Sequence, residues 1–285
     1  MQTAKDLVSD TIQLISLPDA YLRLKSVLDS PNSSMADVAQ VISQDPSLTA
    51  RLLKMVNSPF YGFASKIDTI SRAINMLGTQ QVHDLTLATT IVNSFSGFTN
   101  DKLSIYDFWM NSVYCASSAR LLAFYCDGID TERPFVGGLL HEIGHLVMYQ
   151  QIPDETREAE ALADEKQILL YQAEREVLGF DYAEVGAELM ANLELPESLK
   201  QVTQYHVEPD KAKKEFKLET TIVHIASRIT DAATRDIPVT EELEVHPQSW
   251  EITGLNPEVL PRVKEEADQQ WQMSMDLIFT KKPGS

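Results

Sequence analysis

The sequence has few cationic residues, few cysteines and no long apolar run. Its 24 lysine and arginine residues stand against 42 aspartate and glutamate residues, so the 285-residue chain carries a net charge of −18. An acidic surface repels phosphate backbones and anionic lipid headgroups, which argues against nucleic acid and membranes as partners. No stretch approaches the roughly 18 apolar residues of a membrane-spanning helix, so none is predicted.

The two cysteines, Cys115 and Cys126, are predicted to be free thiols. If both lie on one helix, their spacing separates them by about 16 Å, which is too far for a disulfide. Free thiols are typical of a reducing compartment. The amino terminus interrupts its apolar residues with Lys5, Asp6 and Asp10, so it lacks the apolar core of a secretory signal. A cytoplasmic location is expected.

Apolar residues recur at intervals of three and four, and alternating patterns are rare, which predicts an all-α fold. Asp45 and Pro46 precede an apolar stripe and suit the N-cap and first turn of a helix. Gly78 follows another amphipathic segment and is predicted to end it in a left-handed conformation. A long helix is predicted from about residue 104 to 126 and another from Pro134 to about residue 150.

The helix predicted from Pro134 contains Gly137, Gly138 and Gly144. Each glycine weakens intrinsic helicity by up to about 1 kcal/mol, so something must compensate for them. Close packing of helices is one explanation. A ligand or site pressed against the backbone is the other.

One short motif, HEIGH at residues 141–145, matches the zinc-binding pattern H-E-x-x-H. On a continuous helix, His141 and His145 share a face and can hold one zinc ion between them. Glu142 would then be the general base and Glu165 the third ligand. A zinc metalloprotease is therefore a remote alternative, because five-residue patterns occur by chance and Gly144 interrupts the helix.

Several motifs in a fixed order resemble the HDOD family, which is related to HD-type metal-dependent phosphohydrolases. They are Asp45-Pro46, Asn57-Ser58, Leu77-Gly78 and the string Gly-Leu-Leu-His that ends at His141. The resemblance covers about residues 10–230. It implies an amino-terminal helical bundle packed on a degenerate HD-type helical bundle, with a role in bacterial signal transduction. We expect an amino-terminal subdomain (1–100), an HD-like subdomain (101–235) and a carboxy-terminal helical extension (236–285).

The resemblance also implies a degenerate metal site. Catalytic HD relatives bind divalent metals through histidine and aspartate side chains, because the metal activates water and offsets phosphate charge. Other residues occupy several of those positions here: Ser112, Tyr182, Tyr205 and Ser227. The retained metal ligands would be His141, Glu142 and His206. His224 and Asp231 lie one turn on either side of Ser227. His83, His224 and His246 show no pattern of partners.

The missing ligands favour a non-catalytic signalling or scaffold module that binds a protein partner or a small regulatory ligand. No cofactor is expected, but a divalent metal stays open. If a divalent metal binds, the alternative is a metal-dependent phosphohydrolase acting on a nucleotide or phosphodiester. The candidate ligand- or partner-binding residues are Asp45, Asn57, Ser58 and His145. Each also has a structural explanation, as a helix cap, a helix end or a hydrogen-bonded core histidine.

Overall fold

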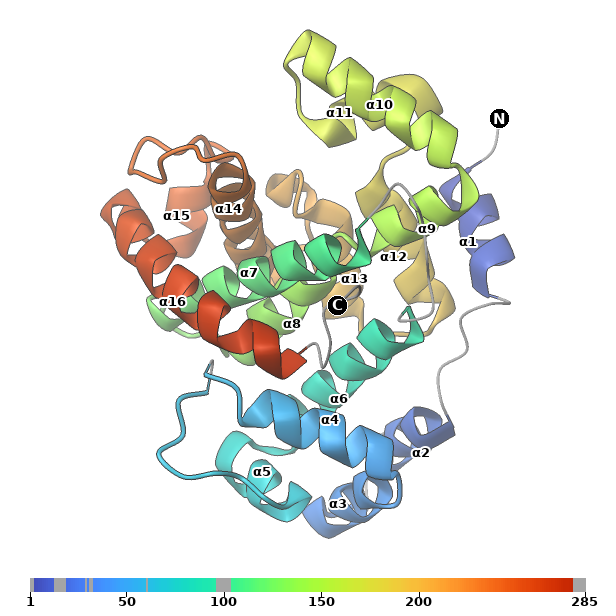
Figure 1. Ribbon diagram of the computed structural model, residues 1–285, viewed down its shortest axis with the longest axis vertical. Coiled ribbons are helices and arrows are strands. Elements are labelled where there is room, and N and C mark those ends of the chain that lie inside the picture. Colours follow the sequence, from blue (N-terminus) through green and yellow to red (C-terminus); the bar gives the residue numbers. More distant parts are fainter. Residues whose placement is uncertain are drawn as a thin grey trace. The chain divides into compact units, whose positions relative to one another are not determined.

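The structure is a computed structural model that describes residues 3–12, 19–28, 30, 33–59, 61–95 and 104–278. Within these ranges all regular secondary structure is helical and no strand is present (Figure 1). The predicted all-α fold is confirmed. None of the helices in these ranges combines the length and the apolar character that crossing a membrane requires.

The chain divides into two compact units. Unit 1 comprises Met1–Ile15 and Phe98–Glu266, and unit 2 comprises Ser16–Gly97 and Ala267–Ser285. The first helix, α1 (Ala4–Ile12), belongs to unit 1 because it packs against α9 (Ile143–Gln151) and α12 (Tyr182–Asn192). The last helix, α16 (Leu260–Ile278), contributes residues to both units. The units therefore differ from the segments 1–100, 101–235 and 236–285 at both ends of the chain.

The helices of unit 2 begin and end where their capping residues predict. They are α2 (Asp19–Leu28), α3 (Met35–Ser43), α4 (Pro46–Val56), α5 (Ile70–Leu77) and α6 (Thr79–Ser94). Asp45 accepts a hydrogen bond from the amide of Leu48 at 2.9 Å, which confirms it as the N-cap of α4. Gly78 ends α5 with a φ of 99°, a conformation that favours glycine. α6 contacts α2, α4 and α5 and forms the centre of this unit.

Unit 1 is a larger helical bundle around α7 (Ile105–Phe124), α8 (Glu132–Leu140) and α14 (Lys217–Thr234), which pack against one another. The predicted long helix from about residue 104 is confirmed as α7. The remaining helices are α10 (Pro153–Lys166), α11 (Leu170–Leu178), α13 (Glu197–Tyr205) and α15 (Ser249–Thr253), with short 3-10 turns at Pro209–Lys211, Lys214–Phe216 and Pro257–Val259.

Glycines in unit 1 lie where helices approach at backbone distance. A Cβ atom at Gly138 in α8 would lie 2.9 Å from the Cα of Ala116 in α7. A Cβ atom at Gly144 in α9 would lie 1.9 Å from the carbonyl oxygen of Tyr182 in α12. Both distances are far below van der Waals contact, so only glycine fits there. Close helix packing therefore accounts for these glycines.

The prediction of one helix from Pro134 to about residue 150 is wrong. α8 ends at Leu140 and α9 begins at Ile143, with His141 and Glu142 in the turn between them. The two helices pack on different partners, since α8 contacts α7 and α14 whereas α9 contacts α12 and α1. A change of direction at residues 141–142 lets each helix bury its own apolar face.

Candidate functional site

Two buried histidines meet in unit 1. His141 at the end of α8 and His206 at the end of α13 have ring centroids 4.9 Å apart and nearly perpendicular rings. Nδ1 of His141 lies 2.7 Å from the carbonyl oxygen of Gly138, and Nδ1 of His206 lies 2.9 Å from that of Thr203. Burial lowers the pKa of His141 to about 4 and that of His206 to about 3. Both rings are therefore neutral, donate through Nδ1 and keep a lone pair on Nε2.

The lone pair of His206 is already engaged within the protein. The phenol oxygen of Tyr182 lies 2.9 Å from Nε2 of His206. Burial raises the pKa of Tyr182 well above its ordinary value, so the phenol keeps its proton and donates it. A metal ion bound at His206 would need the same lone pair. The resemblance expects a metal ligand at the position of Tyr182. Instead, the Tyr182 phenol donates a hydrogen bond to His206, one of the retained ligands.

Both ring nitrogens of His224 also have partners. Nδ1 donates to the carbonyl oxygen of His206 at 2.6 Å, and Nε2 accepts from the backbone amide of His246 at 2.9 Å. Burial lowers the pKa of His224 to about 3, consistent with this neutral form. The side chain of His246 in turn lies 3.3 Å from a carboxylate oxygen of Asp210. The partners of His224 and His246 come from distant segments, so no sequence pattern marks them.

His145, a predicted binding residue, forms a buried pair with Glu174. Nε2 of His145 lies 3.1 Å from one Glu174 oxygen, and the other oxygen accepts the amide of Tyr182 at 2.9 Å. The His145 ring stacks on the Tyr182 ring at a centroid distance of 4.0 Å. Burial lowers the pKa of His145, but the hydrogen bond and charge of Glu174 outweigh it and raise the pKa overall. Glu174 therefore favours the protonated form of His145 within the core.

The serines at two other expected ligand positions use their hydroxyls in hydrogen bonds to the backbone. The hydroxyl of Ser112 donates to the carbonyl of Phe108 at 3.0 Å, and that of Ser227 donates to the carbonyl of His224 at 2.8 Å. The carboxylate of Glu142 lies 3.8 Å from Nε2 of His141, beyond hydrogen-bond distance. Across the described ranges, no three His, Cys, Asp or Glu side chains are placed to hold a metal ion. As arranged, the donor set does not fit a divalent metal.

The geometry assumed for a zinc metalloprotease is also missing from the part of the chain that the structure describes. That alternative needs His141 and His145 on one face of a continuous helix. His141 lies in the turn that precedes α9, and the ring of His145 is directed to Glu174.

Two of the predicted binding residues of unit 2, Asp45 and Asn57, make contacts that stabilise the fold. The amide group of Asn57 donates to the carbonyls of Leu53 and Ile67 and accepts the amide of Ile67, all at 2.7 Å. Asn57 therefore ties the end of α4 to the segment before α5. Ser58 is buried, and its hydroxyl has no hydrogen-bond partner among the described residues. The binding roles of Asp45, Asn57 and Ser58 stay predictions.

A buried His-Asp pair in unit 2 was missed by the sequence reasoning. Nδ1 of His83 lies 2.9 Å from a carboxylate oxygen of Asp84, which also accepts the side-chain amide of Gln80 at 2.9 Å. The ring of His83 stacks on Tyr21 of α2. The adjacency of His83 and Asp84 in the sequence was the available signal. His83 therefore has a partner, although no partner pattern was predicted for it.

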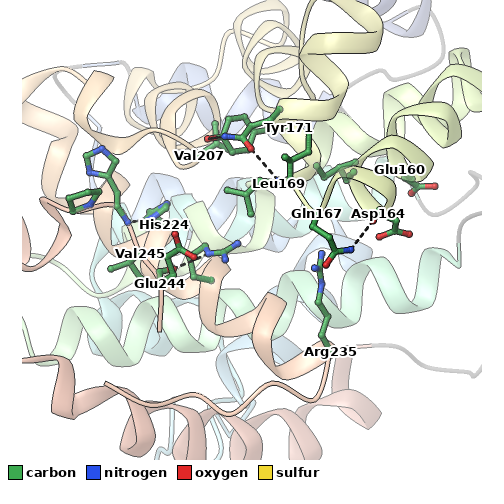
Figure 2. Close-up of a pocket in the computed structure, with 17 residues that line it drawn as sticks. Glu160, Asp164, Gln167, Leu169, Tyr171, Val207, His224, Arg235, Glu244 and Val245 are labelled. Atoms are coloured by element: carbon green, nitrogen blue, oxygen red, sulfur yellow. Dashed lines mark hydrogen bonds between the residues drawn. The ribbon is translucent and has the colours of Figure 1, made fainter. Parts of the chain in front are cut away.

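A pocket of about 750 Å³ lies in unit 1 (Figure 2). Its walls are the end of α10, the connection from α10 to α11, the start of α11, Val207, one face and the C-cap of α14, and the segment 244–247. The pocket is lined by His224 but not by His141, His206 or Tyr182. Sequence reasoning missed it because its walls lie far apart along the chain.

Comparison with known families gives a direct assignment. The HDOD domain model matches residues 14–209, more than half of the chain. The chain belongs to the HDOD family. The family resemblance seen in the motifs is thus confirmed.

Two solved structures share the fold over nearly the whole chain. An HDOD domain protein of unknown function from Geobacter sulfurreducens has a TM-score of 0.76 at 23% identity, covering 97% of this chain and 98% of that one. A protein from Shewanella amazonensis SB2B named "Putative phosphohydrolase" has a TM-score of 0.72 at 25% identity, covering 96% and 98%. An uncharacterized protein of Treponema pallidum (strain Nichols) is 24% identical over 211 residues, which are 74% of this chain but only 41% of that protein.

Proposed function

We propose that this HDOD protein is a non-catalytic signal-transduction module that acts by binding a protein partner or a small regulatory ligand. The observation that carries the proposal is the hydrogen bond from Tyr182 to Nε2 of His206. HD-type hydrolysis needs a metal held by several side chains. Of the two neighbouring histidines, His141 and His206, the second already uses its Nε2 lone pair in the bond from Tyr182.

The contacts of His224 and Asp231 support the same conclusion. The two nitrogens of His224 are bonded to the backbone at His206 and His246. The carboxylate of Asp231 pairs with Arg228 at 3.1 Å and with Arg235 at 3.0 Å. These contacts stabilise the folded chain, and they leave His224 without a free ring nitrogen for a metal.

The competing function is a metal-dependent phosphohydrolase. It is favoured by the proximity of Glu142 to His141 and by the similarity to the Shewanella amazonensis protein. A direct test incubates the purified protein with Mn²⁺, Mg²⁺, Fe²⁺ or Zn²⁺, removes free metal, and measures bound metal together with hydrolysis of bis(p-nitrophenyl) phosphate and nucleotides. We expect no turnover above that of His141→Ala and no stoichiometric metal. Turnover that His141→Ala abolishes would reject the non-catalytic role.

A second variant makes the test sensitive to the proposed cause. Tyr182→His places an imidazole beside His206 in place of the phenol. If the phenol is what saturates His206, this variant should retain more metal than the wild-type protein under the same conditions. Equal metal contents would show that Tyr182 is not the obstacle.

A further inference from the structure

The pocket of unit 1 has the size and separation of a ligand site of its own. Its volume of about 750 Å³ lies within the roughly 300–1,000 Å³ that small-molecule sites usually have. Its polar groups come from three segments, and its apolar side chains include Leu169, Val207 and Val245. Figure 2 shows Glu160 and Asp164 at one side of the pocket, His224 and Glu244 at the other, and Leu169 between them.

Two arginines line the pocket: Arg228 in α14 and Arg235, the residue that directly follows this helix. Arg228 and Arg235 are seven residues apart, which places them on one face about 10 Å apart along the helix. Asp231 lies between them, 3.1 Å from Nη1 of Arg228 and 3.0 Å from Nε of Arg235. Nε of Arg228 also donates to the carbonyl of Glu244 at 3.2 Å. These bonds orient Arg228, whereas Arg235 is largely exposed and has one ion pair. A guanidinium has five N–H donors, so donors remain on each for an anionic ligand.

A second part of the pocket lining is acidic. Glu160 and Asp164 are four residues apart on α10 and therefore share a face of that helix. Burial raises the pKa of Glu160, whereas the phenol of Tyr149 donates to its carboxylate. An ammonium group placed against these two residues would find both a charge partner and hydrogen-bond acceptors.

We propose that this pocket binds a zwitterionic ligand of the amino-acid or short-peptide class. Its carboxylate would pair with Arg228 and Arg235, its ammonium with Glu160 and Asp164, and its apolar side chains would contact Leu169. A multiply charged anion fits less well, because the α10 wall and the net charge of −18 both repel it. The inference rests on the proposed binding role and gives that role a ligand class.

The test is isothermal titration of the full chain with the dipeptide leucyl-leucine and with two analogues that each lack one charge. N-acetyl-leucyl-leucine keeps the carboxylate only, and leucyl-leucinamide keeps the ammonium only. We expect the dipeptide to bind with a Kd below about 1 mM and each analogue to bind at least about tenfold more weakly. No heat from the dipeptide up to about 10 mM would overturn the proposal. Binding of the acetylated form as tight as that of the dipeptide would overturn the zwitterion requirement.

A matched pair of variants locates the site. Arg235→Ala removes a pocket guanidinium, whereas Arg262→Ala removes one of similar exposure that pairs with Glu266 outside the pocket. Arg235→Ala should weaken dipeptide binding at least about tenfold, and Arg262→Ala should leave it unchanged. Equal effects would place the binding elsewhere. This readout is independent of metal content and hydrolysis, so an active hydrolase that binds the dipeptide would refute the non-catalytic role alone.

Discussion

The phenol oxygen of Tyr182 and Nε2 of His206 lie 2.9 Å apart, and both residues are buried. One is a neutral donor and the other a neutral acceptor, because burial raises the pKa of the phenol and lowers that of the imidazole. The bond therefore stabilises α12 against the end of α13 while it occupies the lone pair that a metal would use. Stability and chemistry are coupled at this contact.

Removing the phenol should cost stability. Tyr182→Phe leaves the buried Nε2 of His206 without its donor, so we expect the free energy of unfolding to fall by about 1–3 kcal/mol. Urea denaturation measures the change. Tyr125→Phe is the control, because the Tyr125 phenol lies 3.5 Å from Glu266 and is only partly buried. Equal effects of the two variants would show that the bond to His206 adds nothing.

The buried pair of His145 and Glu174 predicts a larger loss. Glu174→Gln removes the carboxylate that raises the pKa of His145 and weakens the bond to the amide of Tyr182. We expect the free energy of unfolding to fall by about 3 kcal/mol. We also expect a lower pKa of His145, which NMR titration measures. Glu176→Gln, which breaks an exposed pair with Lys166, should change stability by less than about 1 kcal/mol. An unchanged His145 titration in Glu174→Gln would contradict this account.

Helix crossings at glycine predict a difference between two alanine substitutions. Gly144→Ala would place Cβ 1.9 Å from the backbone oxygen of Tyr182, whereas Gly137→Ala would meet the side chain of Val202 at 2.9 Å. Backbone moves less readily than a valine side chain. We expect Gly144→Ala to lose about 3 kcal/mol or more and Gly137→Ala about 1 kcal/mol. Thermal and urea unfolding compare them, and the reverse order would rule out backbone contact as the cause.

The three neutral histidines predict that acid destabilises the protein. The folded-state pKa values of His141, His206 and His224 are about 4, about 3 and about 3, below the unfolded value of about 6.5. The unfolded chain therefore binds more protons between these values. Stability from these groups is complete above about pH 6.5 and falls as the pH drops toward 4, by up to about 1.4 kcal/mol per pH unit for each histidine.

A single variant tests that slope. His141→Asn keeps a donor for the carbonyl of Gly138 but cannot titrate. Between pH 4 and 6 the stability of this variant should depend on pH less steeply than that of the wild-type protein. The difference in slope should correspond to about one fewer proton taken up on unfolding. His145 has the opposite sign, since its raised pKa adds stability that is lost as the pH rises through the folded value. Identical slopes in the two proteins would show that His141 is protonated in the fold.

Local features of the fold were predictable because their causes are local. Asp45 and Pro46 start α4 through bonds within one turn, and Gly78 ends α5 because its φ of 99° excludes other residues. The HDOD family was likewise predictable, because its motifs occur in a fixed order along the chain. In the same way, the replacement of expected ligands by Ser112 and Tyr182 could be read directly from the amino-acid sequence.

Features that depend on distant segments were not predictable. The break between α8 and α9 follows from packing on different helices, which periodicity in one segment does not report. The partners of His224 come from residues 18 and 22 positions away. The pocket combines α10, α14 and the segment 244–247, so no contiguous motif marks it.

The bond from the His246 amide to His224 has a consequence for exchange with solvent. His246 lies in an irregular segment, where backbone amides ordinarily exchange quickly with deuterium. Its own proton is directed at a buried ring nitrogen and is released only when the segment separates from α14. The deuteration rate of this single amide therefore reports how often that side of the cavity opens, and a ligand held there should slow it.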